Sequence, residues 1–79
     1  MSSKDEQYKK EIGARIKEVR VAEGLNQMDF SGRLGVSQPT IYRIELGERL
    51  PSLSLVRELC RCFKVSLDWL INGDDAAGK

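Results

Sequence analysis

Apolar residues recur along this chain at intervals of three and four, the spacing that places side chains on one face of an α-helix. A first helix is predicted from Tyr8 to about Ala22, and Gly24 is expected to end it. Its apolar face consists of Ile12, Ile16 and Val19. The preceding residues, 1–7, are polar and are predicted to form a flexible N-terminal segment.

Two short helices are predicted next, over residues 27–34 and 38–46. Asn26 and Ser37 stand immediately before them, and both residue types favour helix N-caps. Gly35 can take the positive φ that ends a helix within a tight turn. The apolar residues expected to press these two helices together are Phe30, Leu34, Val36, Ile41 and Ile44.

A fourth helix is expected after Ser52, and Ser66 is expected to cap a last short helix over residues 67–71. The tail, residues 74–79, is polar and is predicted to be flexible. The apolar stripe of the fourth helix is predicted to consist of Leu53, Val56, Leu59, Cys60 and Phe63.

No stretch alternates apolar and polar residues as a strand would, so the fold class is predicted to be all-α. The connections are short, which requires neighbouring helices to pack directly on each other. The sequence therefore predicts a compact five-helix bundle over residues 8–73. Within it, the second and third helices have the pattern of a helix-turn-helix, over about residues 27–46.

Composition narrows the function classes. The chain has 79 residues, of which 41% are apolar and 32% charged, as in one small globular domain. It has no apolar run long enough to span a membrane and no secretory signal, so we expect a cytoplasmic protein without a membrane partner. The net charge is only +1, so any affinity for nucleic acid depends on where the charges lie.

Metal and enzyme chemistry are poorly supported. The chain has no histidine, and its two cysteines, Cys60 and Cys62, cannot complete a tetrahedral zinc site. On a helix they point about 200° apart, so we expect one core thiol and one surface thiol rather than a disulfide. No acid–base pair, phosphate-binding glycine loop or evident small-molecule pocket is apparent. We therefore expect no cofactor, no metal and no enzymatic activity.

The third predicted helix has an unusual outer face. Opposite Ile41, a solvated helix usually carries Lys and Glu, whereas this face carries side chains that make directional hydrogen bonds. The residues on or beside it are Gln38, Pro39, Thr40, Tyr42, Arg43 and Leu46.

With these patterns in place, the chain resembles the Cro/CI family of helix-turn-helix proteins over about residues 10–73. The matching stretches are 24-GLNQMDFSGRLGVSQPTIYRIELG-47, a helix opening at Pro51, and 65-VSLDWLING-73. The resemblance implies a sequence-specific regulator of transcription, most simply a repressor, whose third helix enters the major groove of double-stranded DNA. The chain departs from the family at Glu48, where relatives often carry a lysine for the phosphates.

The resemblance implies that the outer face of the third predicted helix contacts the DNA bases. Gln38 can donate to and accept from adenine, and Arg43 suits either guanine or a phosphate. Thr40 and Tyr42 can reach a thymine methyl, a base edge or a backbone oxygen, although the Tyr42 ring could instead pack on its own helix. Pro39 offers only apolar surface, which suits a thymine methyl.

Phosphate contacts are expected at Asn26, Gln27, Ser37 and Arg49, because helix N-termini attract anions and arginine carries a positive charge. In relatives the glutamine matching Gln27 also braces the residue matching Gln38. The resemblance further implies a partly buried ion pair between Arg20 and Glu45, which links the first and third helices.

Relatives bind DNA as symmetric dimers. A homodimer is therefore expected here, with a contact built from Leu67, Trp69 and Leu70 in the last helix, unless these residues only complete the monomer core. The alternative function is a small protein–protein interaction module, of an antitoxin-like or regulatory kind, with little DNA specificity. The sequence leaves open the operator, the regulated genes and the phage, restriction–modification or toxin–antitoxin context.

Overall fold

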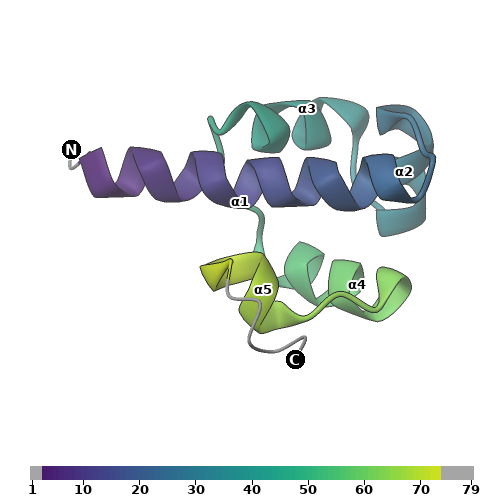
Figure 1. Ribbon diagram of the computed structural model, residues 1–79. Helices are drawn as coiled ribbons and strands as arrows, with labels where there is room; N and C mark the ends of the chain where they lie inside the picture. Colours follow the sequence, from purple (N-terminus) through teal and green to yellow (C-terminus); the bar gives the residue numbers. More distant parts are fainter. Residues whose placement is uncertain (1–2, 74–79) are drawn as a thin grey trace.

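A computed structural model describes residues 3–73, which form five α-helices (Figure 1). The helices are α1 (Ser3–Ala22), α2 (Gln27–Leu34), α3 (Gln38–Leu46), α4 (Leu53–Phe63) and α5 (Leu67–Asn72). The described residues contain no strand, and the all-α, five-helix prediction is confirmed. None of these helices is both long and apolar enough to span a lipid bilayer.

Four of the helices begin at the predicted caps. In each, the cap side chain accepts a hydrogen bond from the backbone N–H three residues later, which satisfies a donor that the helix itself cannot pair. The cap of α2, Asn26, accepts from Asp29 at 2.8 Å. The other three caps are Ser37, Ser52 and Ser66.

Helix α1 begins earlier than predicted, at Ser3 rather than Tyr8. Residues 3–7, which the sequence pattern places in the N-terminal segment before the first helix, are thus the first residues of α1. This first part of α1 has no apolar face, but Gln7 donates to Glu11 at 3.0 Å and an exposed Glu6–Lys9 ion pair spans 3.8 Å. Such contacts between residues three and four apart stabilise a helix without burial. The predicted tail, 74–79, lies outside the described residues.

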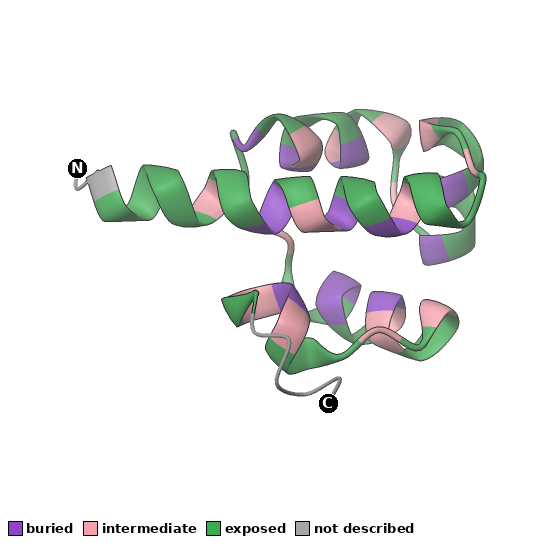
Figure 2. Ribbon diagram, in the orientation of Figure 1, coloured by how far each residue is buried: buried purple, intermediate pink, exposed green. Residues whose placement is uncertain are grey.

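The long helix α1 is the centre of the arrangement. It packs on α3 along one side and on α5 along the other, while α2 contacts both α3 and α4 (Figures 1 and 2). The buried apolar residues come from all five helices and form one cluster: Ile12, Ile16, Val19, Phe30, Leu34, Ile41, Ile44, Leu55, Val56, Leu59 and Leu70. This single core fixes the positions of α2 and α3.

The predicted apolar stripe of α4 needs one correction. Leu53 is 86% exposed, whereas Leu55 is buried. At 100° per residue, Leu55, Val56, Leu59 and Phe63 point within about 100° of one another, and Leu53 lies well outside that sector. Leu53 therefore belongs to the surface of the protein rather than to its core.

Candidate nucleic-acid interface

Helices α2 and α3 are joined by a tight turn at Gly35. This residue has φ 73°, in the left-handed region, and its N–H donates to the Gly32 carbonyl at 3.3 Å. The next N–H, that of Val36, donates to the Ser31 carbonyl at 3.0 Å. These bonds end α2 and allow α3 to begin at Gln38 after the Ser37 cap.

The outer face of α3 is open to solvent. Tyr42 is 50% exposed, Pro39 and Arg43 are exposed, and Gln38 and Thr40 are partly buried. Within residues 3–73, no carboxylate pairs with the Arg43 guanidinium. The face predicted for base contacts therefore presents the exposed Tyr42 and an Arg43 that has no carboxylate partner among the described residues.

Beneath this face, Gln38 is held by a neighbouring side chain. Its Nε2 donates to Oε1 of Gln27 at 2.8 Å, so the first residue of α3 is bonded to the first residue of α2. Gln27 in turn donates from Nε2 to Oε1 of Glu45 at 3.0 Å. The side chain at the start of α3 is thereby tied to the interior of the domain.

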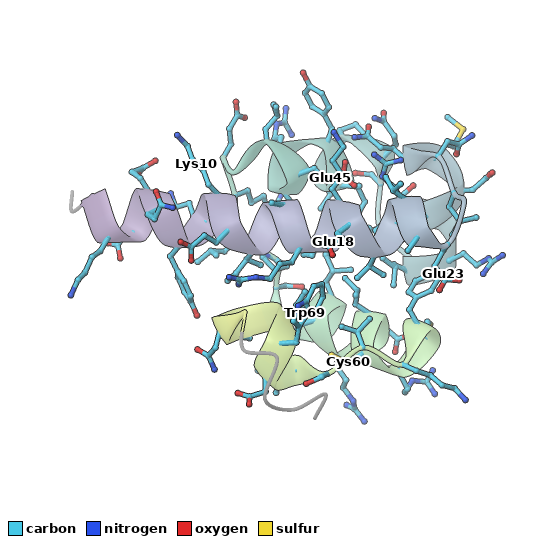
Figure 3. The ribbon with its side chains drawn as sticks, viewed as in Figure 1. Lys10, Glu18, Glu23, Glu45, Cys60 and Trp69 are labelled. Carbon is cyan, nitrogen blue, oxygen red and sulfur yellow. The ribbon has the colours of Figure 1, made fainter. Side chains whose placement is uncertain are left out.

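Glu45 and Arg20 join α3 to α1. Nε and Nη2 of Arg20 donate to the two carboxylate oxygens of Glu45 at 2.7 and 3.0 Å, and Nη1 donates to the Leu25 carbonyl at 2.9 Å. The side chains are only 13% and 4% exposed, and Glu45 lies at the junction of α1 and α3 (Figure 3). The hydrogen bonds to Glu45 raise the pKa of Arg20, although its burial acts in the opposite direction. Both charges are compensated in this geometry.

The residues predicted for phosphate contacts lie at both helix starts and in the following loop. Asn26, Ser37 and Arg49 are exposed. The Asn26 side-chain oxygen already accepts from Asp29, and the Ser37 hydroxyl is 2.8 Å from that of Thr40. Asn26 thus retains its amide N–H groups, and Arg49 its guanidinium, for an anion.

The residues predicted for a dimer contact separate into three environments. Leu67 is 55% exposed, and Trp69 is partly buried against the core. Leu70 is wholly buried, so its side chain cannot reach a partner. The prediction that Leu70 takes part in a dimer contact is therefore wrong, because this residue completes the monomer core.

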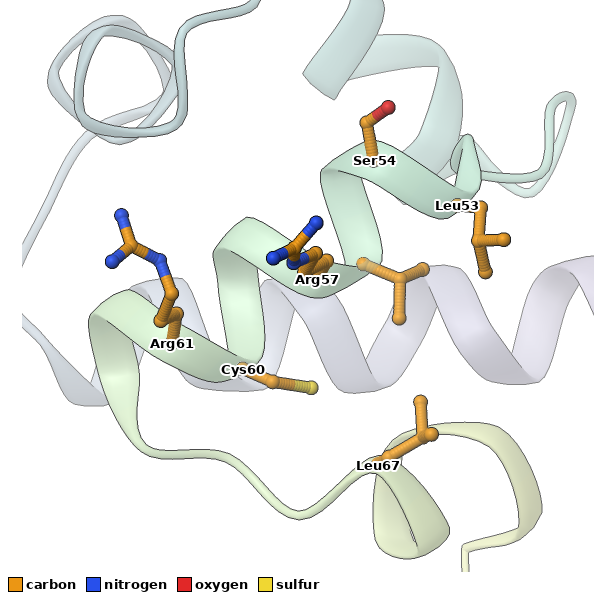
Figure 4. A pocket seen from close by; sticks show the side chains of 7 residues that line it. Leu53, Ser54, Arg57, Cys60, Arg61 and Leu67 are labelled. Atoms are coloured by element: carbon orange, nitrogen blue, oxygen red, sulfur yellow. The ribbon is translucent and has the colours of Figure 1, made fainter.

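An apolar groove of about 680 Å³ lies between α4 and α5 (Figure 4). Cys60 is partly buried beside it, and burial raises the pKa of this thiol, whereas Cys62 on the same helix is exposed. The groove is lined by Leu53, Ser54, Val56, Arg57, Cys60, Arg61 and Leu67. The exposed leucine of α5 is thus continuous with a larger apolar surface.

Sequence reasoning missed Arg15, which fixes the end of α5. Its Nη1 donates to the carbonyls of Leu70 and Ile71 at 3.1 and 3.2 Å. These are carbonyls of the last turn of a helix, which lack partners inside the helix. No local signal marks this contact, because it joins α1 to a segment more than fifty positions away along the chain.

A short helix packed across a second one, with a free outer face and a third helix behind it, defines a helix-turn-helix DNA-binding domain. Comparison with known proteins gives the family: residues 16–70 match the helix-turn-helix family model, and the chain belongs to this family, of the Cro/CI type. It is a DNA-binding regulator of transcription, in a family that is not enzymatic.

Several curated proteins are similar along most of their length. A protein named as the uncharacterized HTH-type transcriptional regulator YgzD of Bacillus subtilis is 32% identical over 59 residues, 71% of this chain and 89% of that protein. A regulator with a corresponding name from Methanocaldococcus jannaschii is 39% identical over 62 residues, 77% of this chain and 94% of its own. One from Archaeoglobus fulgidus is 34% identical over 61 residues, 77% and 87% of the two chains.

Proposed function

We propose that the protein is a sequence-specific repressor that binds a palindromic operator as a homodimer, with α3 in the major groove. One observation supports this proposal: two side chains suited to reading bases lie on the same face of α3. Gln38 is fixed by its hydrogen bond to Gln27, and no carboxylate within residues 3–73 neutralises Arg43. A side chain fixed before binding loses less conformational entropy when it meets a base. A free arginine can donate two parallel bonds to guanine.

The base contacts proposed are those of the outer face of α3. Gln38 reads adenine, and Arg43 reads guanine or, failing that, binds a phosphate. Tyr42, with half of its surface exposed, can contact a thymine methyl or a backbone oxygen. Thr40 and Pro39 stand at the same end of α3 and offer a hydroxyl and an apolar ring.

The phosphate contacts proposed are at Asn26, Gln27, Ser37 and Arg49. The first two stand at the N-terminus of α2, where free N–H groups and the helix dipole favour an anion. Ser37 has the corresponding position at α3. With a net charge of +1, the domain neutralises few phosphates, so we expect a modest dependence of affinity on salt.

The dimer contact proposed combines Leu67 and Trp69 with the groove beside Leu53. The exposed side chains of Leu53 and Leu67 flank this groove, and a second copy would remove both from water. A symmetric dimer reads two half-sites about 34 Å apart, one turn of DNA. Where the operator overlaps a promoter, such a complex would exclude polymerase, which is why we propose repression.

The proposal is tested by selecting binding sites from random-sequence duplexes at near-physiological salt. The double variant Gln38→Ala, Arg43→Ala is run beside the unaltered protein. Lys64→Gln serves as a control, because it removes an exposed positive charge from the connection between α4 and α5. Circular dichroism of all three proteins shows whether each is folded.

Enrichment of an inverted repeat by the unaltered protein and the control, lost in the double variant, would support the proposal. If the folded protein enriches no sequence, specific operator binding is excluded. The same bundle would then be considered as a protein–protein interaction module. Repression itself is read from a reporter gene placed behind the selected site, and an increase in expression would contradict that part.

A further inference from the structure

We infer that Glu45, a residue that does not face the DNA, determines which base Gln38 accepts. This inference rests on the proposed function, because it concerns the adenine contact of Gln38. The side chain of Glu45 is 4% exposed and is occupied by Arg20, so it cannot itself reach a base. It acts through Gln27, as a positioning residue.

The first step is the fixed chemistry of the Glu45 carboxylate. Arg20 donates to both of its oxygens, and a carboxylate can only accept hydrogen bonds. The neighbouring amide of Gln27 must therefore turn its Nε2 toward Glu45, as the 3.0 Å bond shows. The opposite orientation would place the amide oxygen of Gln27 against a carboxylate oxygen.

The orientation of the Gln27 amide in turn fixes that of the Gln38 amide in α3. With its nitrogen directed at Glu45, Gln27 presents Oε1 to Gln38. Gln38 must then donate, and its Nε2 lies 2.8 Å from that oxygen. One N–H of Gln38 is used in this bond, so one N–H and the whole of Oε1 remain for a base.

The third step is the match to the major groove. Adenine offers an N6 donor beside an N7 acceptor, which fits one acceptor and one donor on Gln38. Guanine offers two acceptors, O6 and N7, so the fixed Oε1 of Gln38 would face O6 without a hydrogen atom between them. A glutamine that could rotate freely would turn its nitrogen toward guanine and lose this discrimination.

The chain from Arg20 through Glu45 and Gln27 to Gln38 therefore rejects guanine at the base read by Gln38. Only the last residue of the four needs to touch that base. Loss of one link should lower discrimination without removing the contact itself. A phosphate contact, by contrast, changes the affinity for every sequence alike.

The test compares two operators that differ only in adenine or guanine at the position where Gln38→Ala abolishes the preference. The ratio of their dissociation constants is measured at fixed salt for the unaltered protein, Gln27→Met and Glu45→Gln. Gln27→Met keeps the length of the side chain but removes its amide. Glu45→Gln keeps the shape of the side chain, but its amide can either donate or accept.

We expect the unaltered protein to prefer adenine and both variants to lose about tenfold of that preference, which corresponds to roughly 1.4 kcal/mol. Arg49→Ala is the matched comparison: it should weaken binding to both operators equally and leave the ratio intact. If Glu45→Gln does not fold, the double variant Arg20→Met, Glu45→Leu takes its place, because it removes the carboxylate without leaving a buried unpaired charge.

Two results would overturn the inference: folded variants that keep the full adenine preference, or an unaltered protein that prefers guanine. A failure of the proposed function can be distinguished from these results, because the unaltered protein would then enrich no operator in the selection from random-sequence duplexes. In that case the inference fails together with the proposal on which it rests.

Discussion

Gly13 of α1 lies directly against the main chain of Ile44 in α3. A β-carbon built on Gly13 would overlap the Ile44 carbonyl oxygen, and the Ile44 carbonyl carbon would be 3.2 Å away. Both neighbours are backbone atoms, which cannot move aside without displacing the helix. The absence of a side chain at Gly13 thus sets how closely the two helices pack.

The first prediction is that Gly13→Ala destabilises the fold. Alanine favours a helix over glycine by up to about 1 kcal/mol, but a forced separation of α1 and α3 costs typically about 1–3 kcal/mol. We expect a net loss, measured as a lower urea midpoint followed by circular dichroism. The matched variant is Gly32→Ala in α2, where, within residues 3–73, no atom from outside α2 lies within 4 Å of an added β-carbon.

Gly32→Ala should raise the free energy of unfolding by up to about 1 kcal/mol, because only the helix propensity changes. The two identical substitutions are therefore expected to act in opposite directions. If Gly13→Ala were as stable as Gly32→Ala, the close approach of α1 and α3 would not limit the packing.

The starts of α2 to α5 could be predicted from the sequence because their signals are local. A Ser or Asn cap precedes each of these helices within a few residues of its apolar period. A glycine follows α2, α3 and α5, whereas α4 ends at Lys64. The orientation of Ile41 and Ile44 toward the core follows from the same period. Tyr42 and Arg43 are then left on the outer face of α3 by geometry alone.

Other features depend on contacts between distant segments. Gly13 appears on the chain as an ordinary helix interruption, and only its closeness to α3 gives it a role. The bond from Gln27 to Glu45 depends on how α2 and α3 cross, which the sequence pattern does not specify. Leu70 resembles Leu67 in sequence, yet one is buried and the other exposed, because the position of α5 on α1 decides between them.

The second prediction concerns the Arg20–Glu45 ion pair. Arg20→Met leaves the Glu45 carboxylate, 4% exposed, without its partner, and we expect a loss of about 3–5 kcal/mol in stability. Adding Glu45→Leu should recover much of this loss, since an apolar pair avoids an uncompensated buried charge. Both are measured by urea unfolding, and an additive double variant would contradict the pairing.

The pH dependence of this pair follows from the raised pKa of Arg20. A raised folded-state pKa gives a contribution that is complete below the unfolded-state pKa and is lost only as pH rises through the folded one. Both lie in strongly alkaline solution for arginine. The stability difference between the unaltered protein and the double variant Arg20→Met, Glu45→Leu, in which neither position titrates, should therefore stay constant between about pH 6 and 9.

The third prediction separates the two cysteines. Burial raises the pKa of the Cys60 thiol, so less of it is thiolate at mildly alkaline pH, and the thiolate is the nucleophile. Cys62 is exposed. We expect iodoacetamide to label Cys62 first, as read by peptide mass spectrometry. In Cys62→Ser the fast phase should disappear, and in urea the two thiols should react at similar rates.

The fourth prediction tests the proposed dimer. Leu67→Asp places a charge at the edge of the groove between α4 and α5, where it would be buried by a second copy. Sedimentation should show a monomer at concentrations where the unaltered protein is a dimer, and affinity for a full palindrome should fall to that for one half-site. Val21→Asp, also at an exposed apolar residue, is the control.

If Leu67→Asp and Val21→Asp have the same oligomeric state as the unaltered protein, the second copy does not use this groove. A monomeric unaltered protein at all concentrations would exclude the dimer itself. Because Leu67 is 55% exposed in the monomer, its replacement should not unfold the domain, and circular dichroism checks this directly.

The fifth prediction decides between the two roles of Arg43 by using Arg49 as a reference. Arg49 is proposed to bind only phosphate, so Arg49→Ala should weaken all sequences alike and lower the slope of log affinity against log salt by about 0.9. If Arg43 reads guanine, Arg43→Ala should relax one operator position, with a discrimination loss of about 1–3 kcal/mol. A uniform loss with the same change in salt slope would instead assign Arg43 to a phosphate. If Arg43→Ala retains both affinity and specificity, Arg43 does not contact the DNA. The unpaired charge of Arg43 would then no longer support the proposed function.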